Sequence, residues 1–218
     1  MEVKEAICRR RSIRKFKPDP VPEAMLHDML EMSRLAPSAG NKQPWRFVVV
    51  RDIGIRKRLR ECCYGLRLVE EAPCIFVCCA DLTVYLDNIT RVRLEELEQA
   101  GVFDDVGELV FTPPVYTTGN VDIKIFDADA QMNCAITITH MVLTATSLGL
   151  GSCWVGLTDR KKVHKMFSFP STMRVLALLA VGFPNQDPPP RPRLPLKEIV
   201  LQPIEEVAFS LTAIQSET

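Results

Sequence analysis

The chain has 218 residues, of which 47% are hydrophobic and 25% are charged. These fractions are typical of a globular domain, and they exclude disordered, collagen-like and low-complexity classes of protein. The 27 Lys and Arg residues balance the 27 Asp and Glu residues, so no net charge attracts the chain to nucleic acid or an anionic membrane. We expect neither as a partner, and we predict one domain over residues 1–218.

Helices and apolar strands alternate along the chain. Helices are expected at 2–11, 23–35, 53–63, 91–100, 128–148 and up to 167, and strands at 45–50, 74–80, 152–156 and 175–183. Thr158 and Asp159 are the two candidate N-caps of the last helix. Strands separated by helices indicate a sheet covered on both faces, in the α/β or α+β class. Residues 81–126 carry little readable pattern besides the helix at 91–100.

Residues 130–158 contain no Asp, Glu, Lys or Arg. The stretch is long enough to span a bilayer. However, it follows two aspartates, contains Gln131, Asn133 and His140, and ends in glycines. We therefore predict a helix buried in a large core or in a subunit interface, and not a membrane span.

The eight cysteines do not form a disulfide or metal pattern. Cys62–Cys63 and Cys78–Cys79 are adjacent pairs, and three cysteines lie in the apolar run 74–80, where cysteine is usually a small buried hydrophobe. No Cys-x-x-Cys spacing occurs and there are three histidines, so we expect no zinc or iron–sulfur site. The first residues lack the apolar stretch of a signal peptide. We expect a reduced, soluble, cytoplasmic protein.

The densest charge cluster is the segment 9–17, which has six cations among nine residues. Guanidinium groups match phosphate oxygens, and Ser12 with backbone N–H groups could complete a phosphate site. A solvated basic face or a nucleic-acid patch would explain the same residues. A second basic pair, Arg191 and Arg193, lies on a proline-rich segment near the other end of the chain.

Common nucleotide motifs do not account for these clusters. No Gly-x-Gly-x-x-Gly follows a strand, so a Rossmann unit is unsupported. Gly151 and Gly156 have the spacing of a P-loop, but Leu157 and Thr158 follow where that motif needs Lys and Ser or Thr.

Four motifs, taken in order, carry a resemblance to a known family. They are RRSIRKF at 10–16, APSAGNKQPW at 36–45, GLGSCWVG at 149–156 and RPRLP at 191–195. Together they resemble the nitroreductase family of FMN enzymes across nearly the whole chain. The resemblance implies an α+β fold of α/β-type three-layer form, with a mostly antiparallel central sheet flanked by helices. It also implies an intertwined homodimer with FMN at the subunit interface, and residues 127–148 as the central dimer helix.

The same resemblance implies which residues bind the flavin. The ribityl phosphate would be held by Arg10, Arg11, Ser12 and Arg14, joined by Arg191 and Arg193. The loop that approaches from the other subunit would supply Pro37, Ser38, Ala39, Asn41 and Gln43. The backbone lining the isoalloxazine, with an amide near its N5, would be that of Trp154, Val155, Gly156 and Leu157. The chain departs from the family at Gly65, Leu66 and Leu68, where some members offer polar contacts.

The activity implied is hydride transfer from NADH or NADPH to an electron-poor acceptor, such as a nitroaromatic or a quinone, by a ping-pong mechanism. Flavin N5 would carry the chemistry, so no catalytic side chain is expected. A dehalogenase, a flavin-fragmenting enzyme, an enoate reductase and a flavin binder without turnover are alternatives on the same scaffold. A nucleic-acid-binding module using residues 9–17 is the alternative from another class. The family implies that residues 81–126 shape the substrate mouth.

Four further residues are interpreted as structural. Cys153 is expected to be a small packing residue, because nothing in the sequence near it indicates a lowered thiol pKa. Trp45 and Trp154 are expected to pack, and His140 to be a buried or interface histidine.

Two substitutions test the shared phosphate site. Arg14→Ala and Arg193→Ala should each weaken FMN binding by about 1.5–3 kcal/mol, because each removes a hydrogen bond to a charged group. Fluorescence titration of the FMN-free protein measures this. Unchanged affinity in both variants would contradict a phosphate site shared by the two basic clusters.

Overall fold

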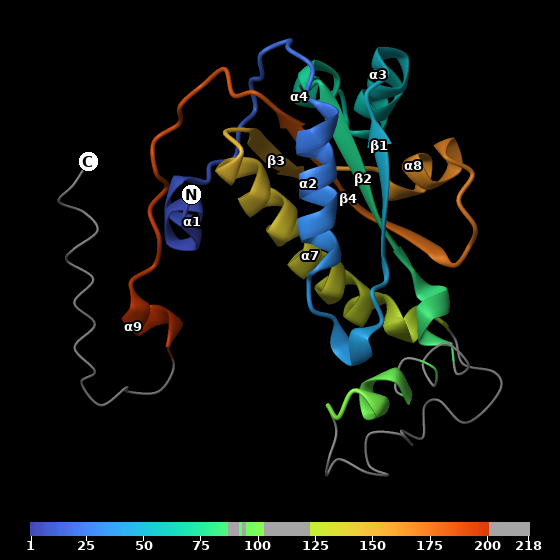
Figure 1. Ribbon diagram of the computed structural model, residues 1–218. Helices are drawn as coiled ribbons and strands as arrows, with labels where there is room; N and C mark the ends of the chain where they lie inside the picture. Colours follow the sequence, from blue (N-terminus) through green and yellow to red (C-terminus); the bar gives the residue numbers. More distant parts are fainter. Residues whose placement is uncertain (87–91, 93–94, 103–122, 201–218) are drawn as a thin grey trace. The chain divides into compact units, whose positions relative to one another are not determined.

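The structure is a computed structural model that describes residues 1–86, 92, 95–102 and 123–200 (Figure 1). Two compact units are distinguished, Met1–Pro188 and a second unit that begins at Pro189. Each is described by itself. Much of the predicted substrate mouth, 81–126, lies outside the described residues. Within the helix expected at 91–100, the described residues 92 and 95–99 are helical, as predicted.

The first unit is built on a four-stranded antiparallel sheet. Its strands are β1 (Trp45–Val50), β2 (Cys74–Asp81), β3 (Gly151–Val155) and β4 (Met173–Gly182), in the order β1-β2-β4-β3. All four were predicted, with ends displaced by one or two residues. The central pair, β2 and β4, consists almost entirely of buried apolar residues, as expected for strands covered on both faces.

Helices cover both faces of this sheet (Figure 1). One face is covered by α2 (Glu23–Arg34) and α7 (Asp127–Ser147), and the other by α3 (Ile53–Cys62), α4 (Arg67–Glu71) and α8 (Arg160–Met166). The helix α1 (Val3–Arg9) packs against α7. Short 3₁₀ segments are η1 (Ala39–Asn41), η2 (Leu82–Tyr85) and η3 (Ile123–Phe126). The three-layer α+β architecture is confirmed; the second unit contributes α9 (Leu196–Ile199).

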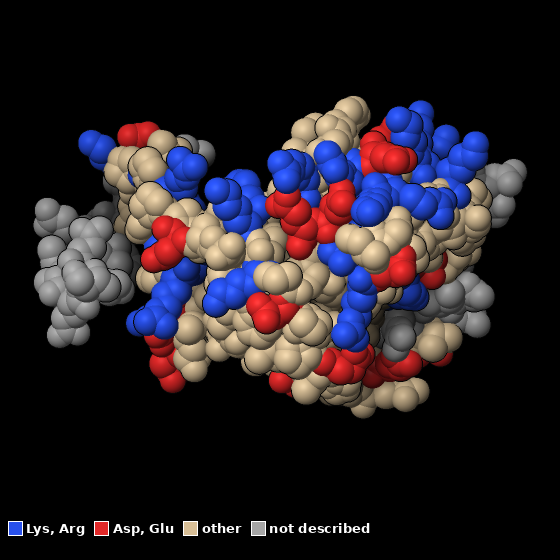
Figure 2. Space-filling model, turned by 90° about the horizontal axis from the view of Figure 1, so that it is seen from above, with Lys and Arg blue, Asp and Glu red and all other residues tan. Residues whose placement is uncertain are grey.

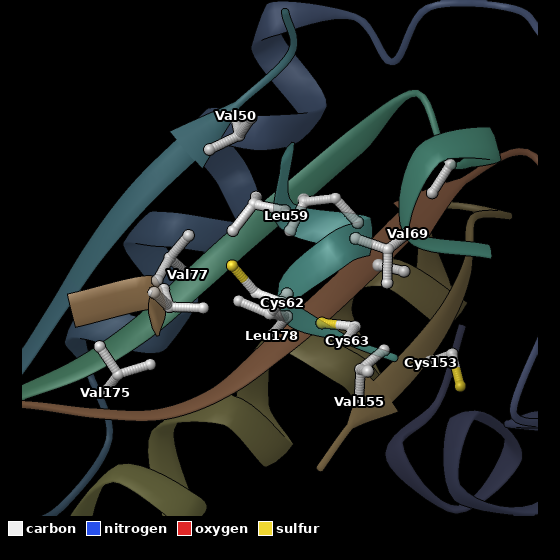
Figure 3. Close-up of a cluster of buried hydrophobic side chains, with 14 of the residues drawn as sticks. Val50, Leu59, Cys62, Cys63, Val69, Val77, Cys153, Val155, Val175 and Leu178 are labelled. Atoms are coloured by element: carbon white, nitrogen blue, oxygen red, sulfur yellow. The ribbon is translucent and has the colours of Figure 1, made fainter. Parts of the chain in front are cut away.

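Successive side chains along each strand point to opposite faces of the sheet, so the core is divided into one layer on each face. On β2, Ile75 and Val77 point towards α3, α4 and α8, whereas Phe76 points towards α2 and α7. Figure 3 shows the first of these clusters, in which Leu59 and Val69 pack over Val77 and Leu178. Apolar area removed from water in these two layers is the main stabilising contribution to the fold.

Side-chain caps fix where two of the helices begin. Asp52 Oδ1 accepts the Ile55 N–H at 2.8 Å at the start of α3. Asp159, one of the two caps considered, accepts the Lys162 N–H at 3.1 Å at the start of α8. Such caps satisfy backbone donors that the first helical turn leaves free.

The helix α7, which carries no charged residue after Asp129, is a core helix, as predicted. It packs against α1, α2 and the sheet, and its inner side includes the fully buried Ala130, Ile138 and Met141. No helix within the described ranges has the length and apolar character needed to cross a bilayer.

The cysteines behave as the sequence indicates. All eight are free and seven are buried. Burial raises the pKa of the Cys74, Cys79 and Cys134 thiols to about 12, so they stay protonated and pack as small hydrophobes.

A short pairing joins the basic segment to β3. Ser12 and Ser152 form a parallel bridge, and the Ile13 N–H donates to the Ser152 carbonyl at 2.9 Å. Ile13 packs so tightly over Gly151 that a Cβ on Gly151 would lie 2.7 Å from Ile13 Cγ1. The close approach therefore requires glycine at position 151.

This contact gives a stability prediction. Gly151→Ala should cost about 1–3 kcal/mol of unfolding free energy, because the added methyl overpacks a buried β-branched side chain. Gly156→Ala is the matched control, since its Cβ would meet nothing closer than Trp154 Nε1 at 4.0 Å. Urea unfolding of the unaltered protein and of the two variants, all free of FMN and at the same protein concentration, measures the difference in unfolding free energy. Equal loss of stability in the two variants would contradict the proposed clash.

Candidate active site

The basic segment presents alternate side chains to opposite sides. Residues 10–14 are extended where Ser12 pairs with Ser152, so Arg10, Ser12 and Arg14 share one side. Ile13, on the other side, is buried in the core. Neither Arg10 nor Arg14 forms an ion pair with any residue that the structure describes. Their guanidinium groups are therefore available to an anion.

Arg11 lies apart from these residues. Its guanidinium donates to the Cys8 carbonyl at 2.6 Å and to the Arg10 carbonyl at 3.0 Å, which satisfies the end of α1. It also lines a pocket of about 210 Å³ that includes Arg9 and Ile13 but neither Arg10 nor Arg14. The structure therefore brings together three of the four predicted phosphate ligands in this segment and places Arg11 elsewhere.

The strand β3 begins next to this segment, at the Ser12–Ser152 pairing, and ends at Val155. Val155 is buried, whereas Gly156 and Leu157 are exposed, so the backbone after β3 is accessible. Trp45 is buried, as expected, but the packing expected for Trp154 is wrong because its side chain is 44% exposed. Trp154 points to the open side of an edge strand, and the apolar run around it gave no indication of this.

The loop 37–43 is held by its own hydrogen bonds. Ser38 Oγ accepts the Gln43 N–H at 2.9 Å, and the Gln43 amide donates to the Asn41 side chain at 2.9 Å. Gly40, Asn41 and Gln43 have φ of 56°, 50° and 50°, a left-handed conformation that only glycine adopts without cost. The loop is thus fixed in a strained form, as is common at binding sites.

Asn133 on α7 fixes the position of this loop. Its Oδ1 accepts the Ala39 N–H at 3.1 Å, and its Nδ2 donates to Tyr85 Oη at 3.0 Å. Asn133 and Thr146 are both on α7, and their spacing corresponds to about 20 Å along the helix axis. Thr146 belongs to the end of α7 where Arg11 and Gly151 lie. One chain thus carries its loop and its basic segment at opposite ends of α7 (Figure 1).

Three residues near the loop were not predicted as site residues. Besides Asn133, they are Tyr85 and Lys42. The Tyr85 ring stacks on the Phe126 ring with 4.9 Å between their centres, and the Lys42 ammonium lies 5.7 Å from the centre of the Tyr85 ring. Burial lowers the pKa of Lys42, and Asp129 partly opposes this shift. A polar side chain that is buried on a core helix needs a hydrogen-bond partner. The position of Asn133 in the apolar stretch of α7 was therefore the signal that could have indicated its role.

Cys153 and His140 have the structural roles expected. Cys153 is 5% exposed, and burial raises the pKa of its thiol although Arg14 opposes the shift. His140 is half-buried, and its Nδ1–H donates to the Met32 carbonyl at 3.2 Å. Among the described residues, no group of three or more His, Cys, Asp and Glu side chains could hold a metal ion.

The remaining predicted residues are less defined. Arg191 and Arg193 belong to the second unit, where Arg193 donates to the Arg191 and Pro192 carbonyls at 3.3 and 3.1 Å. Their convergence with Arg14 stays a prediction. Gly65 turns the chain between α3 and α4 with φ of 78°, and its carbonyl accepts from Arg60 at 3.1 Å.

Comparison with known proteins decides the family. The Nitroreductase family profile matches residues 7–183. This chain belongs to the nitroreductase family of NAD(P)H oxidoreductases. It is 36% identical over 201 residues to an NADH dehydrogenase of Thermus thermophilus, with 92% of this chain and 96% of that one covered. It is also 26% identical to an FMN reductase [NAD(P)H] of Bacillus subtilis, with 91% of this chain and 72% of that one covered.

A solved structure has the same fold. NfrA2 of B. megaterium superimposes with a TM-score of 0.72 at 22% identity, covering 97% of this chain and 77% of that one. The antiparallel sheet between two helical layers is therefore the nitroreductase fold.

The residues present fit FMN. The guanidinium groups of Arg10 and Arg14, which form no ion pair with any described residue, and the Ser12 hydroxyl suit a phosphate. The accessible backbone at 156–157 suits the edge of a flat ring. The single chain offers these groups at one end of α7 and the preformed loop at the other.

The loop anchor yields a second prediction. Asn133→Leu should lower the unfolding free energy by about 1–3 kcal/mol, because it leaves the Ala39 N–H without its acceptor. Tyr85→Phe, which removes a hydroxyl and leaves that acceptor in place, should cost less. Thr139→Ala, on the exposed side of the same helix, is the control and should be near neutral. Thermal unfolding measures all three; equal effects for Asn133→Leu and Thr139→Ala would contradict the anchoring role.

Proposed function

We propose that this protein is a homodimeric, FMN-dependent oxidoreductase that transfers hydride from NADH or NADPH to an electron-poor acceptor by a ping-pong mechanism. The observation that carries this proposal is the Ser12–Ser152 pairing. It joins the segment that carries Arg10 and Arg14 to β3, the strand that leads to the exposed Gly156 and Leu157. A phosphate and the ring attached to it would be held by these two neighbouring segments.

Arg10, Ser12 and Arg14 would bind the ribityl phosphate of FMN. Charge-assisted hydrogen bonds from guanidinium groups are the strongest that a protein offers to such a group. Arg14 already lies close to Ser12, since its Nη1 donates to the Ser12 carbonyl at 3.2 Å. We propose Arg191 and Arg193 as further ligands, on the same chemistry. We keep Arg11 as a secondary ligand that would have to leave the carbonyls of Cys8 and Arg10.

A second copy of the chain would complete each site. The loop 37–43 lies about 20 Å along α7 from the basic segment of its own chain, so it would serve the partner's flavin. Exposed apolar side chains support such an interface: Val3 and Ile7 lie one turn apart on α1, and Met132 lies on α7. Trp154 and Leu157, also exposed, would be covered there. Large exposed apolar groups of this kind mark interaction surfaces.

FMN, when bound, supplies the acceptance and release of hydride; the chain supplies binding and orientation. Backbone N–H groups at 154–157 would donate to the flavin edge, and the arginines would stabilise the negative charge of the reduced form. The exposed Trp154 and Leu157 would exclude water from that edge. The same open face would receive the nicotinamide first and the acceptor afterwards, which gives ping-pong kinetics.

The alternative functions on the same fold differ in the acceptor that they reduce or in what happens to FMN. A dehalogenase or an enoate reductase would use the same bound flavin and donor with another acceptor. A flavin-fragmenting enzyme would consume FMN, and a binder without turnover would not be reduced by either nucleotide. Nitroaromatic or quinone reduction is preferred because hydride transfer to such acceptors requires no additional protein acid.

Anaerobic absorption spectroscopy tests this proposal. The purified protein should show a flavin band that bleaches with NADH or NADPH and returns when a nitroaromatic or a quinone is added. A flavin band that resists both nucleotides would contradict the proposed turnover. A protein that contains no flavin and takes up no added FMN would contradict the cofactor.

A further inference from the structure

A second pocket lies where α8 covers the first residues of β4. Its volume is about 390 Å³, and it is lined by Arg160, Lys161, His164, Ser171, Met173, Arg174 and Val175. None of these residues is among those proposed to bind the flavin. The last β3–β4 pair is Val155 with Leu178, so the pocket lies beyond the end of β3.

The lining is cationic and holds no carboxylate. Arg160 and Lys161 are exposed and form no ion pair with any described residue, since the nearby Asp159 pairs with Lys162 at 3.6 Å. Figure 2 shows Lys and Arg side chains gathered on the side of the molecule where α3 and α8 lie, with carboxylates among them. Of the arginine and lysine side chains in this lining, Arg160 and Lys161 thus have no carboxylate partner among the described residues, whereas Arg174 pairs with Asp127.

Two of the lining side chains, those of Arg174 and His164, are held in place by the chain itself. Arg174 Nε donates to Asp127 Oδ1 at 2.8 Å, and its Nη1 donates to the Ser171 carbonyl at 2.5 Å. His164 Nε2–H donates to the Pro170 carbonyl at 3.0 Å, with the ring edge-on to Phe169 at 6.0 Å. Because a carbonyl only accepts, His164 keeps its Nδ1 for another partner. Such fixed groups lose little entropy when a ligand binds.

The sequence of α8 conflicts with a purely structural role. Arg160 and His164, like Lys161 and Lys165, are four residues apart on the helix, a spacing at which like charges repel when both are protonated. Cations in the first turn of a helix also oppose its dipole. An anion bound between them would offset both costs.

The shape and chemistry of the pocket indicate the ligand class. Met173 and Val175 form an apolar floor, Ser171 offers a hydroxyl, and the cations stand on the α8 side. Its volume lies within the range of small-molecule sites, about 300–1,000 Å³. Arginine, lysine and a hydroxyl together suit a phosphate better than a single carboxylate. An apolar floor suits a flat organic group attached to it.

We propose that this pocket binds a phosphate monoester carried by a small organic molecule. The 2′-phosphate of NADPH is one source, and this source rests on the proposed function. Arg160 follows Leu157 by three residues, so the two Cα atoms lie within about 11 Å of one another. A separate phosphorylated molecule that binds at the surface is the other source of the same chemistry.

Calorimetric titration of the FMN-loaded protein with adenosine 2′-monophosphate tests the site. The Arg160→Ala/Lys161→Ala variant should bind this probe about tenfold more weakly or worse, because it loses charge-assisted contacts. Lys57→Ala/Arg58→Ala on α3 is the matched control, since it removes the same charge from two exposed side chains that form no ion pair with any described residue. The control should bind like the unaltered protein. Equal binding in all three proteins, or equal affinity for adenosine without its phosphate, would overturn the proposal.

Steady-state kinetics then separate the two sources. If the pocket holds the donor's phosphate, the α8 variant should raise the KM for NADPH and leave the KM for NADH unchanged. If a separate molecule binds there, probe binding should weaken while both KM values stay the same; either result supports the site. Flavin content and NADH turnover test the proposed function, whereas binding of adenosine 2′-monophosphate tests the pocket. The two proposals can therefore fail separately, and the measurements show which one has failed.

Discussion

The short contact between Ile13 and Gly151 is the constraint on which the rest of the site depends. It allows the Ser12–Ser152 pairing, which ties a basic segment near the start of the chain to a strand that begins at Gly151. Because side chains alternate along that segment, burial of Ile13 turns Arg10, Ser12 and Arg14 together to the other side. A single packing contact thus orders a charged stretch of sequence against β3, and the proposed phosphate site rests on this arrangement.

The helix α7 sets the scale of the site. Its inner side is packed into the core, so it acts as a rigid spacer between the loop anchored by Asn133 and the start of β3. A rise of about 1.5 Å per residue keeps these two parts of one chain far apart. A flavin that contacts both parts would therefore need two chains, and the exposed apolar residues of α1 and α7 offer the surface for that association. The fold, the proposed dimer and the proposed cofactor site are linked through this one helix.

The sheet and its main helices were predictable because each carries a strong local pattern. β2 and β4 are continuous apolar runs, and Asp52 and Asp159 are ordinary caps. The helix α4 was not predicted, because its five residues are too short to show a helical repeat. The phosphate ligands stay a prediction: the sequence places Arg10 and Arg14 in one cluster with Arg11, and only tertiary pairing shows which side each occupies. Trp154 was wrongly expected to be packed. It lies on β3, which is an edge strand of the sheet, and the local sequence does not show which strand lies at the edge.

The central claim is that each flavin site uses two chains, and complementation between two defective chains tests it most directly. One chain would carry Arg10→Ala and Arg14→Ala, the other Ser38→Ala and Asn41→Ala, each with its own affinity tag, and the two would be co-expressed. In the mixed dimer one site combines the two intact halves and the other combines the two altered halves. The account predicts that neither variant alone retains FMN and that the purified mixed dimer binds about one FMN per dimer. A mixed dimer that binds no more FMN than the separate variants would contradict it.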